Sequence, residues 1–179
     1  QTSPHPHWCG YSPDGKYAVT NHNRSLAEIY NQKIKPVTFF HDLVAGSSKQ
    51  LFAGEKLLPR GVDWTQDSKS FYFVAPYTTH PYLYNASINL LYTYDVASGR
   101  HQKIELNWEN GLGGYGGITP APDGFLALLA SGARNKAARY TRSGSGWTRQ
   151  MIEGEHSTNI QGFTLTEDGA TALYVYSTA

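Results

Sequence analysis

The side chains best suited to bind a ligand or partner lie in two long connecting segments and two shorter ones. They combine imidazole, guanidinium and phenol groups: His22, Arg24, Arg60, His80, Tyr82, Tyr84 and His156. Arginine pairs with carboxylates, and aromatic rings pack on apolar side chains. This mixture predicts contacts with peptide termini or apolar side chains, and therefore loops that face a substrate or a partner.

No residue of the chain is predicted to be catalytic. A nucleophilic serine on a strand-to-helix turn requires the pentapeptide Gly-x-Ser-x-Gly. The nearest match, Gly144-Ser145-Gly146, fails because Ser143 stands at the first position of the pattern. Covalent chemistry is therefore expected outside this chain.

Two short motifs match cofactor patterns in part, and neither predicts a cofactor. His5-Pro6-His7-Trp8-Cys9 offers three soft-metal ligands, but Pro6 restrains the backbone and no second ligand cluster follows. A strand with Trp8 in the core is expected instead. Gly111-Leu112-Gly113-Gly114-Tyr115-Gly116 fits a dinucleotide pattern, but Ile118-Thr119-Pro120 leads into a hairpin rather than a helix. We expect a flexible connection there, and neither a metal nor another cofactor.

The charge of the chain is nearly balanced. Fifteen Lys and Arg residues against fourteen Asp and Glu give a formal net charge of +1, too small to attract nucleic acid or anionic lipid over the whole molecule. The basic residues Arg134, Lys136, Arg139 and Arg142 are spaced so that they do not share one strand face, which indicates a solvated outer strand. No apolar run approaches the roughly 20 residues that span a bilayer. We expect no nucleic-acid partner and no membrane span.

A turn motif recurs four times and organises the chain. Its copies are Ser12-Pro13-Asp14-Gly15, Thr65-Gln66-Asp67-Ser68, Ala121-Pro122-Asp123-Gly124 and Thr166-Glu167-Asp168-Gly169, with Asp-to-Asp separations of 53, 56 and 45 residues. Ser, Pro, Asp and Gly in this order are typical of a type I turn. Four and five residues after each Asp stand two adjacent apolar residues: Ala18-Val19, Phe71-Tyr72, Ala127-Leu128 and Ala172-Leu173. Adjacent apolar residues predict a strand that is covered on both faces.

A second hairpin follows the turn motif in phase. Asp42 and Asp95 each lie 28 residues after the turn Asp, each follows an aromatic strand, and each precedes a Gly by four positions. Every repeat thus contains about four short strands, as in the blades of β-propellers, whereas a solenoid has shorter repeats. The predicted fold is all-β, an incomplete β-propeller of about three and a half four-stranded antiparallel blades. It is one partial domain over residues 1–179, with blades approximately at 7–58, 59–110, 111–154 and, truncated, 155–179.

The loops are expected to gather on one face of this disc. Successive antiparallel strands reverse direction, so every second connection emerges on the same side. The long connections 21–35 and 76–89 therefore share a face with the blade-to-blade connections that carry Arg60 and Glu155-His156. Connections of this length are often functional.

The unit Ser12-Pro13-Asp14-Gly15-Lys16-Tyr17, with hairpins such as Asp95-Val96-Ala97-Ser98-Gly99, resembles the propeller repeats of the prolyl oligopeptidase family of serine peptidases. The acylaminoacyl-peptidase-like members, with an N-terminal propeller, are the nearest in kind, and the resemblance covers roughly residues 7 to 177. It implies that this chain is a non-catalytic part of a longer protein. It also implies that an α/β-hydrolase domain of the same parent protein carries a Ser-Asp-His triad, and that the propeller limits the access of a peptide substrate.

The same unit also resembles TolB-type periplasmic propellers and oligogalacturonate lyase, which gives two alternatives. One is a protein-interaction module without a hydrolase. The other is a polysaccharide-active lyase in which His22, His80 and His156 gather around a metal. Open blade edges predict self-association. With Cys9 as its one cysteine, the sequence does not fix the compartment and slightly favours a periplasmic or secreted location over the cytoplasm.

Overall fold

The computed structural model describes residues 6–25, 34–80, 87–114, 117–155, 157 and 160–177, and the regular elements in these ranges are all strands. They are β1 (Pro6–Tyr11), β2 (Tyr17–His22), β3 (Val37–Asp42), β4 (Ser47–Leu51), β5 (Val62–Trp64), β6 (Ser70–Tyr77), β7 (Ile88–Asp95), β8 (Arg100–Lys103), β9 (Ile118–Ala121), β10 (Gly124–Ser131), β11 (Arg134–Ser143), β12 (Gly146–Met151), β13 (Ile160–Leu165) and β14 (Ala172–Tyr176). The described residues contain no helix, and the predicted all-β class is confirmed.

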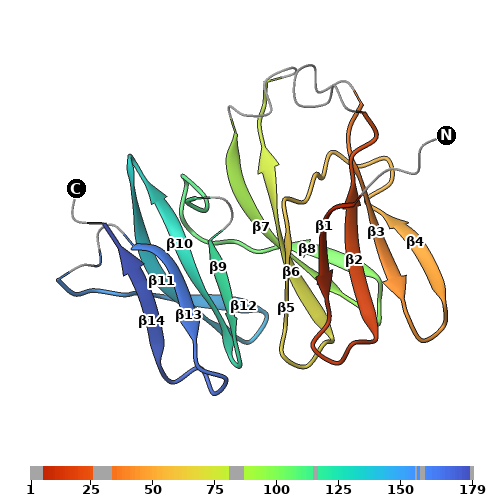
Figure 1. Cartoon of the computed structure of the whole chain (residues 1–179). Coiled ribbons are helices and arrows are strands. Elements are labelled where there is room, and N and C mark those ends of the chain that lie inside the picture. The colour runs from red at the N-terminus through yellow and green to blue at the C-terminus, as the bar shows by residue number, and fades with distance from the viewer. Residues whose placement is uncertain are drawn as a thin grey trace.

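The strands form three four-stranded antiparallel sheets and one hairpin (Figure 1). Blade 1 has the order β1-β2-β3-β4, blade 2 the order β5-β6-β7-β8, and blade 3 the strands β9 to β12 in the same sense. The fourth unit is the hairpin of β13 and β14. Within each unit, each strand therefore pairs with its neighbours in the chain, as the hairpins of the repeat predict.

The blades are held together by three layers of apolar side chains, one between each pair of neighbours. Side chains alternate along β6, so Phe71 and Phe73 join the core shared with blade 1, whereas Tyr72 and Val74 join the core shared with blade 3. A smaller core between blade 3 and the hairpin contains Leu128, Ala137 and Ile160. Both faces of blades 2 and 3 are thus buried, as the adjacent apolar residues of their second strands predict.

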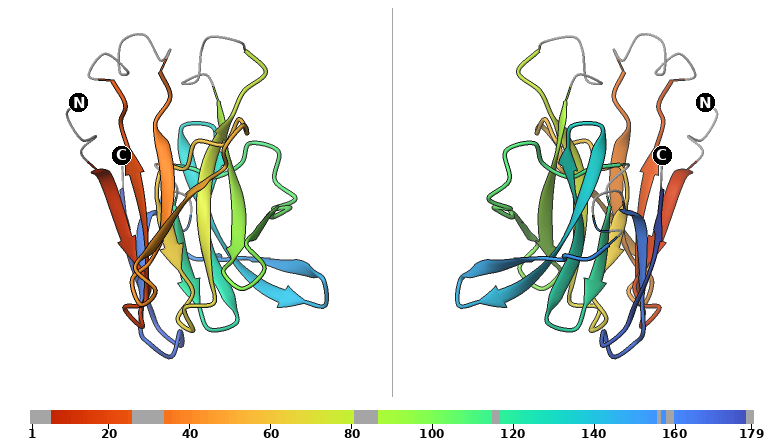
Figure 2. Two further views of the ribbon diagram at one scale, coloured as in Figure 1. Left: turned by 90° about the vertical axis from the view of Figure 1, so that its right-hand side faces the viewer. Right: turned by 90° about the vertical axis from the view of Figure 1, so that its left-hand side faces the viewer.

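The first strands of the blades converge and the last strands diverge. Contacts between successive units run through β1 and β5, β5 and β9, and β9 and β13. A Cβ atom at Gly10 would lie 2.4 Å from Val62 Cγ2, and the Trp64 indole Nε1 donates to the Gly10 carbonyl at 3.2 Å. The outer strand β12 projects on the side opposite β1 and β14 in both views of Figure 2. The sheets are therefore arranged as a fan about their first strands.

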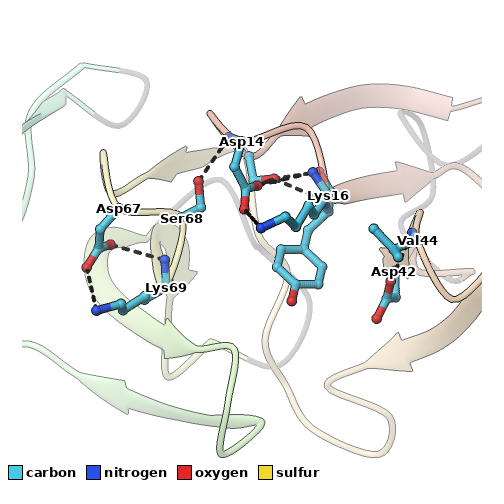
Figure 3. Close-up of polar contacts among 9 residues, drawn as sticks. Asp14, Lys16, Asp42, Val44, Asp67, Ser68 and Lys69 are labelled. Atoms are coloured by element: carbon cyan, nitrogen blue, oxygen red, sulfur yellow. Dashed lines mark hydrogen bonds and ion pairs between the residues drawn. The ribbon is translucent and has the colours of Figure 1, made fainter.

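Three of the four repeated turns share one hydrogen-bond pattern. The Ser12 hydroxyl donates to Asp14 Oδ1 at 2.7 Å and accepts from the Tyr17 amide at 2.9 Å, and the Lys16 amide donates to Asp14 Oδ1 at 3.1 Å (Figure 3). These bonds, the hydroxyl's first, lower the pKa of Asp14 to about 2. The turns at Asp67 and Asp168 repeat the pattern through threonine hydroxyls. The hydroxyl-aspartate pair closes the hairpin between the first two strands.

The third turn departs from this pattern because Ala121 has no hydroxyl to bond the aspartate. The turn there is shortened to Pro122 and Asp123, and Gly124 is already part of β10. Asp123 instead accepts a bond from Arg139 at 2.7 Å. A Cβ atom at Gly124 would lie 1.9 Å from the Tyr140 carbonyl oxygen, so this glycine allows the close approach of β11.

Neighbouring turns are bonded to one another around the first strands. Ser68 has a φ of 59°, where the equivalent Gly15 has 71°, and its side chain is buried. The Ser68 hydroxyl accepts a hydrogen bond from the Asp14 amide at 3.1 Å. The Gln66 amide nitrogen donates to the Glu167 carbonyl at 2.8 Å, although 101 positions separate the two residues. The turns therefore contribute contacts between units besides closing their own hairpins.

The fourth repeat does not bury its apolar pair as predicted. Leu173 is 73% exposed and Val175 is 65% exposed, and β14 is exposed along its whole length. Among the described residues, β14 pairs with β13 alone. The prediction of two covered faces is correct for the second strands of blades 2 and 3 and wrong for this one. In blade 1 both Ala18 and Val19 are buried, but no other described blade packs on the face that carries Ala18.

The glycine-rich segment before β9 is packed rather than flexible over residues 111–114; residues 115 and 116 lie outside the described ranges. Leu112 is 2% exposed and bridges Asn89 of blade 2 to Leu129 of blade 3. The Gly113 amide donates to the Leu128 carbonyl at 2.9 Å. The segment therefore joins the two blades as an extra strand-like bridge.

Replacing Ser68 tests the bond between the first two turns. Ser68→Ala keeps a side chain at positive φ and leaves the Asp14 amide without its acceptor, so we expect a loss of about 1 to 2 kcal/mol in the free energy of unfolding. Ser68→Gly loses the same acceptor but relieves the backbone, so we expect a smaller loss. Urea unfolding followed by tryptophan fluorescence measures both. An alanine variant as stable as the parent chain would contradict the role assigned to the hydroxyl, and a glycine variant less stable than the alanine variant would contradict the backbone strain assigned to position 68.

The exposed strand β14 generates a second prediction. An apolar strand with an unpaired edge pairs readily with another strand, and a charge on such an edge opposes that pairing. We expect the chain to associate as its concentration rises, and Val175→Lys to reduce this association. Sedimentation velocity across a hundredfold concentration range measures it, with Val44→Lys in the β3–β4 turn as the matched control. Equal association of both variants would exclude β14 as the contact.

Candidate functional site

The connections of the blades separate onto two opposite faces. In each blade the first and second strands join at one end, and the second and third strands join at the other end. We call these the turn face and the loop face. The connection from β4 to β5 leaves from the loop face, at the end of blade 1 where β2 ends with His22. The connection from β8 to β9 leaves from the same face, at the end of blade 2 where β6 ends with Tyr77 (Figure 1). The predicted gathering of long loops and blade-to-blade connections on one face is confirmed for these strands.

A groove of about 470 Å³ lies on the loop face at blade 1. Its walls are the start of β3, the end of β4 and the connection from β4 to β5. Arg24 and Lys35 provide cationic groups, Glu55 provides a carboxylate, and Leu57 and Leu58 provide half-buried apolar surface. The groove therefore offers both charge and apolar contact to an occupant.

The connection that forms this groove is fixed to blade 2. Glu55 Oε2 lies 3.1 Å from Nε2 of His101 on β8. The ring of Phe52 stands edge-on to His101 with centroids 5.3 Å apart, and its centroid lies 4.8 Å from that of Phe73. Phe52 holds a φ of 55°, a conformation that these contacts must compensate. The wall of the groove is therefore positioned by packing between blades.

A second groove, of about 490 Å³, occupies the equivalent place at blade 2. Its walls are the start of β7, the end of β8 and the connection to β9. Ile88, Leu90 and Trp108 give it apolar surface, and Lys103 pairs with Glu105 beside it at 2.9 Å. Two successive blades thus repeat one groove architecture on the loop face.

Comparison with known protein families finds no match, and no curated protein matches the sequence. Several solved structures are similar. The β-propeller domain of Cps50 (Swd1) from Myceliophteria thermophila superposes with a TM-score of 0.60 at 10% identity, over 97% of this chain and 50% of that one. The β-propeller domain of the Trilobed protease from Pyrococcus furiosus gives 0.53 at 13% identity, over 90% and 46%. Acylaminoacyl peptidase from Pyrococcus horikoshii gives 0.54 at 11% identity, over 90% and 26%.

The fold is an incomplete β-propeller. The chain spans half or less of the length of the three proteins that it resembles. At identities of 10 to 13%, the likeness establishes the fold and not the activity.

The structure brings one of the predicted site residues, Arg24, into a groove of the propeller. His22 lies at the end of β2 and bonds Thr20 on the face of blade 1 that points away from blade 2. Arg60 makes a backbone contact, in which its amide donates a hydrogen bond to the Val74 carbonyl at 3.0 Å. The His80 amide bonds the Thr78 hydroxyl in an exposed segment. Tyr82, Tyr84 and His156 lie outside the described residues.

The basic residues of β11 do not form a patch. Arg139 pairs with Asp123, Lys136 Nζ lies 5.8 Å from the ring centre of Trp108, and the Arg142 guanidinium lies 5.8 Å from that of Trp147. Each of these three cations has its own neighbour. The described residues contain no group of three His, Cys, Asp or Glu side chains arranged to hold a metal ion, and no described helix is long and apolar enough to cross a membrane.

Asp63 is a titratable residue in a buried setting that the sequence analysis did not single out. It lies on β5, the first strand of blade 2, opposite Tyr72 and therefore on the side that faces blade 3. Burial raises its pKa to about 6. The turn aspartates behave in the opposite way, because hydroxyl and amide donors lower their pKa values. No motif surrounds Asp63 in the sequence, so only its place in the propeller distinguishes it.

Asp63→Asn tests this assignment through pH. Because the folded-state pKa lies above the unfolded value of 3.8, ionisation opposes folding, and stability falls as the pH rises from about 4 to about 6. We expect the asparagine variant to be more stable than the parent chain at pH 7, by about 1 to 3 kcal/mol, and equal to it below about pH 4. Thermal and urea unfolding across this range measure the difference.

Asp95→Asn is the matched control for this prediction. The Ser98 hydroxyl and amide bond Asp95 at 2.6 and 2.7 Å and lower its pKa. The stability that Asp95 contributes is present above its unfolded pKa and is lost as the pH falls, so the control should be less stable than the parent chain at pH 7. Stabilities that shift in the same direction for both variants would refute the burial of Asp63.

Proposed function

We propose that this chain is the non-catalytic propeller portion of a prolyl-oligopeptidase-like serine peptidase, where it controls or supports the access of a peptide to a separate α/β-hydrolase domain of the same parent protein. The observation that carries this proposal is the pair of equivalent grooves on the loop face. Their described lining residues include both charged and apolar side chains. Propellers of two proteases, the Trilobed protease and acylaminoacyl peptidase, share the fold and support the proposal.

The first groove suits an extended peptide. Arg24 and Lys35 match a peptide carboxylate, and the half-buried Leu57 and Leu58 match an apolar side chain. Its wall is fixed to blade 2 through Glu55 and His101, so a bound segment meets a preformed surface. The propeller thus binds the peptide on a rigid wall, and the separate α/β-hydrolase domain carries out the reaction.

Sequencing the gene on both sides of this segment tests the architecture directly. We expect an α/β-hydrolase domain with a Gly-x-Ser-x-Gly nucleophile motif followed by Asp and His. A gene in which no such domain accompanies the propeller would overturn the proposal. That outcome would favour a propeller that acts through protein interaction.

Leu58→Asp in the full-length protein tests the role of the groove. A carboxylate in a half-buried apolar wall repels an apolar side chain and a peptide carboxylate, so we expect kcat/KM for peptides of several residues to fall about tenfold, which corresponds to about 1.4 kcal/mol. Hydrolysis of a small chromogenic ester should not change, because the triad lies in the other domain. Steady-state kinetics with both substrates measures this difference.

Val44→Asp is the matched control, because Val44 is 76% exposed in the β3–β4 turn on the opposite face. It should leave both activities unchanged. Loss of ester and peptide hydrolysis in equal measure with Leu58→Asp, or a similar loss with Val44→Asp, would exclude a substrate-contacting role for the groove.

A further inference from the structure

The face of blade 1 that points away from blade 2 carries two histidines directed at one hydroxyl. Thr20 pairs with Phe39, and Ala18 pairs with His41, so the side chains of Thr20, His22 and His41 share this face. Val19 and Phe40, which alternate with them, belong to the core shared with blade 2. We call the face that carries Thr20, His22 and His41 the open face of blade 1, because no other described blade packs on it.

The imidazoles converge on the open face. Nε2 of His22 and Nε2 of His41 each lie 2.8 Å from Thr20 Oγ1, so the two nitrogens are no more than twice that distance apart. A divalent transition metal binds imidazole nitrogen at about 2.0 to 2.1 Å. Two nitrogens that meet at one point, on partly buried rings, need small side-chain rotations to share a cation at the place where the hydroxyl now bridges them.

His41 has the outer contact expected of a metal ligand. Its Nδ1 lies 2.7 Å from Ser48 Oγ, which leaves Nε2 directed toward Thr20 and His22. A ligating histidine almost always bonds a second group through its other ring nitrogen, and that bond fixes the orientation of the ring.

The same positions in blade 2 are apolar. Counted from the turn aspartates, Thr20 corresponds to Phe73, His22 to Ala75 and, through the second hairpin, His41 to Tyr94. All three residues of blade 2 are buried in the core shared with blade 1. Blade 2 thus has an apolar core at these positions, and blade 1 has two imidazoles and one hydroxyl there.

We infer that His22 and His41 form a two-histidine site for a divalent transition-metal cation, of the class of Zn²⁺, Ni²⁺ and Cu²⁺, on the open face of blade 1. Imidazole ligands suit these ions, and solvent completes the coordination. The site differs from the lyase alternative, in which histidines of several blades surround the channel. It also does not depend on the proposed peptidase function.

Titration with Cu²⁺, which binds such sites most tightly, tests the inference in the full chain. The background carries Cys9→Ser, His5→Gln and His7→Gln, so the thiol and the N-terminal histidines do not contribute. We expect one bound Cu²⁺ per chain, with nitrogen hyperfine splitting from two imidazoles in the electron paramagnetic resonance spectrum. His22→Gln or His41→Gln should weaken binding at least about tenfold, because the second ligand no longer acts at high effective concentration.

Two further variants separate a metal site from a structural network. Thr20→Ala keeps both imidazoles and removes the hydroxyl that they bond, so it should bind Cu²⁺ at least as tightly as the background chain. His101→Gln, which alters a histidine bonded to Glu55 instead, should bind equally well. Binding that is absent from the background chain, or that survives loss of both His22 and His41, would overturn the inference. So would a loss of equal size in His101→Gln or Thr20→Ala.

Discussion

Packing between sheets is the constraint on which the rest of this molecule depends. Blade 2 has apolar side chains on both faces, with Phe71 and Phe73 on one side and Tyr72 and Val74 on the other. A sheet with two apolar faces is stable only between two others, because an uncovered apolar face costs about 25 cal/mol for each square ångström left in water. Each blade therefore covers the apolar faces of its neighbours, and the repeat unit is stable only within a stack of blades.

The same packing gives the two ends of the stack different connections and therefore different properties. On the turn face the chain reverses within a few residues, and the hydroxyl-aspartate pairs and the bond from Asp14 to Ser68 use the local polar groups to close hairpins and join units. On the loop face the chain must travel from the outer strand of one blade to the first strand of the next. Those longer paths leave grooves beside them, and the grooves carry charged and apolar groups together. The loop face can therefore recognise a ligand or partner, whereas the polar groups of the turn face close hairpins and join units.

The sequence predicted the elements of the fold better than the site. The Asp turns, the aromatic third strands and the adjacent apolar residues are local patterns, and the strands lie where these patterns place them. The shorter third turn could have been predicted from Ala121, which lacks the hydroxyl present at Ser12 and Thr166. The first groove could not, because its wall depends on contacts from Phe52 and Glu55 to His101, about fifty positions away. Sequence reasoning assigned His22 to the loops, whereas its side chain turns back along β2 to Thr20.

The first blade shows how one repeat can acquire chemistry that the others lack. In blade 2 the positions of Phe73 and Tyr94 are occupied by the rings that hold blade 1 in place, so a polar side chain there would lose its hydration without gaining a partner. The equivalent positions of blade 1 lie on a face that no other described blade covers, and there Thr20 and His41 satisfy each other and Ser48 without disturbing the core. Val19 and Phe40 alternate with them and pack toward blade 2 together with Leu51, so the two faces of this sheet make separate contacts. The sheet of blade 1 can therefore differ on one face while its other face continues to hold the stack together.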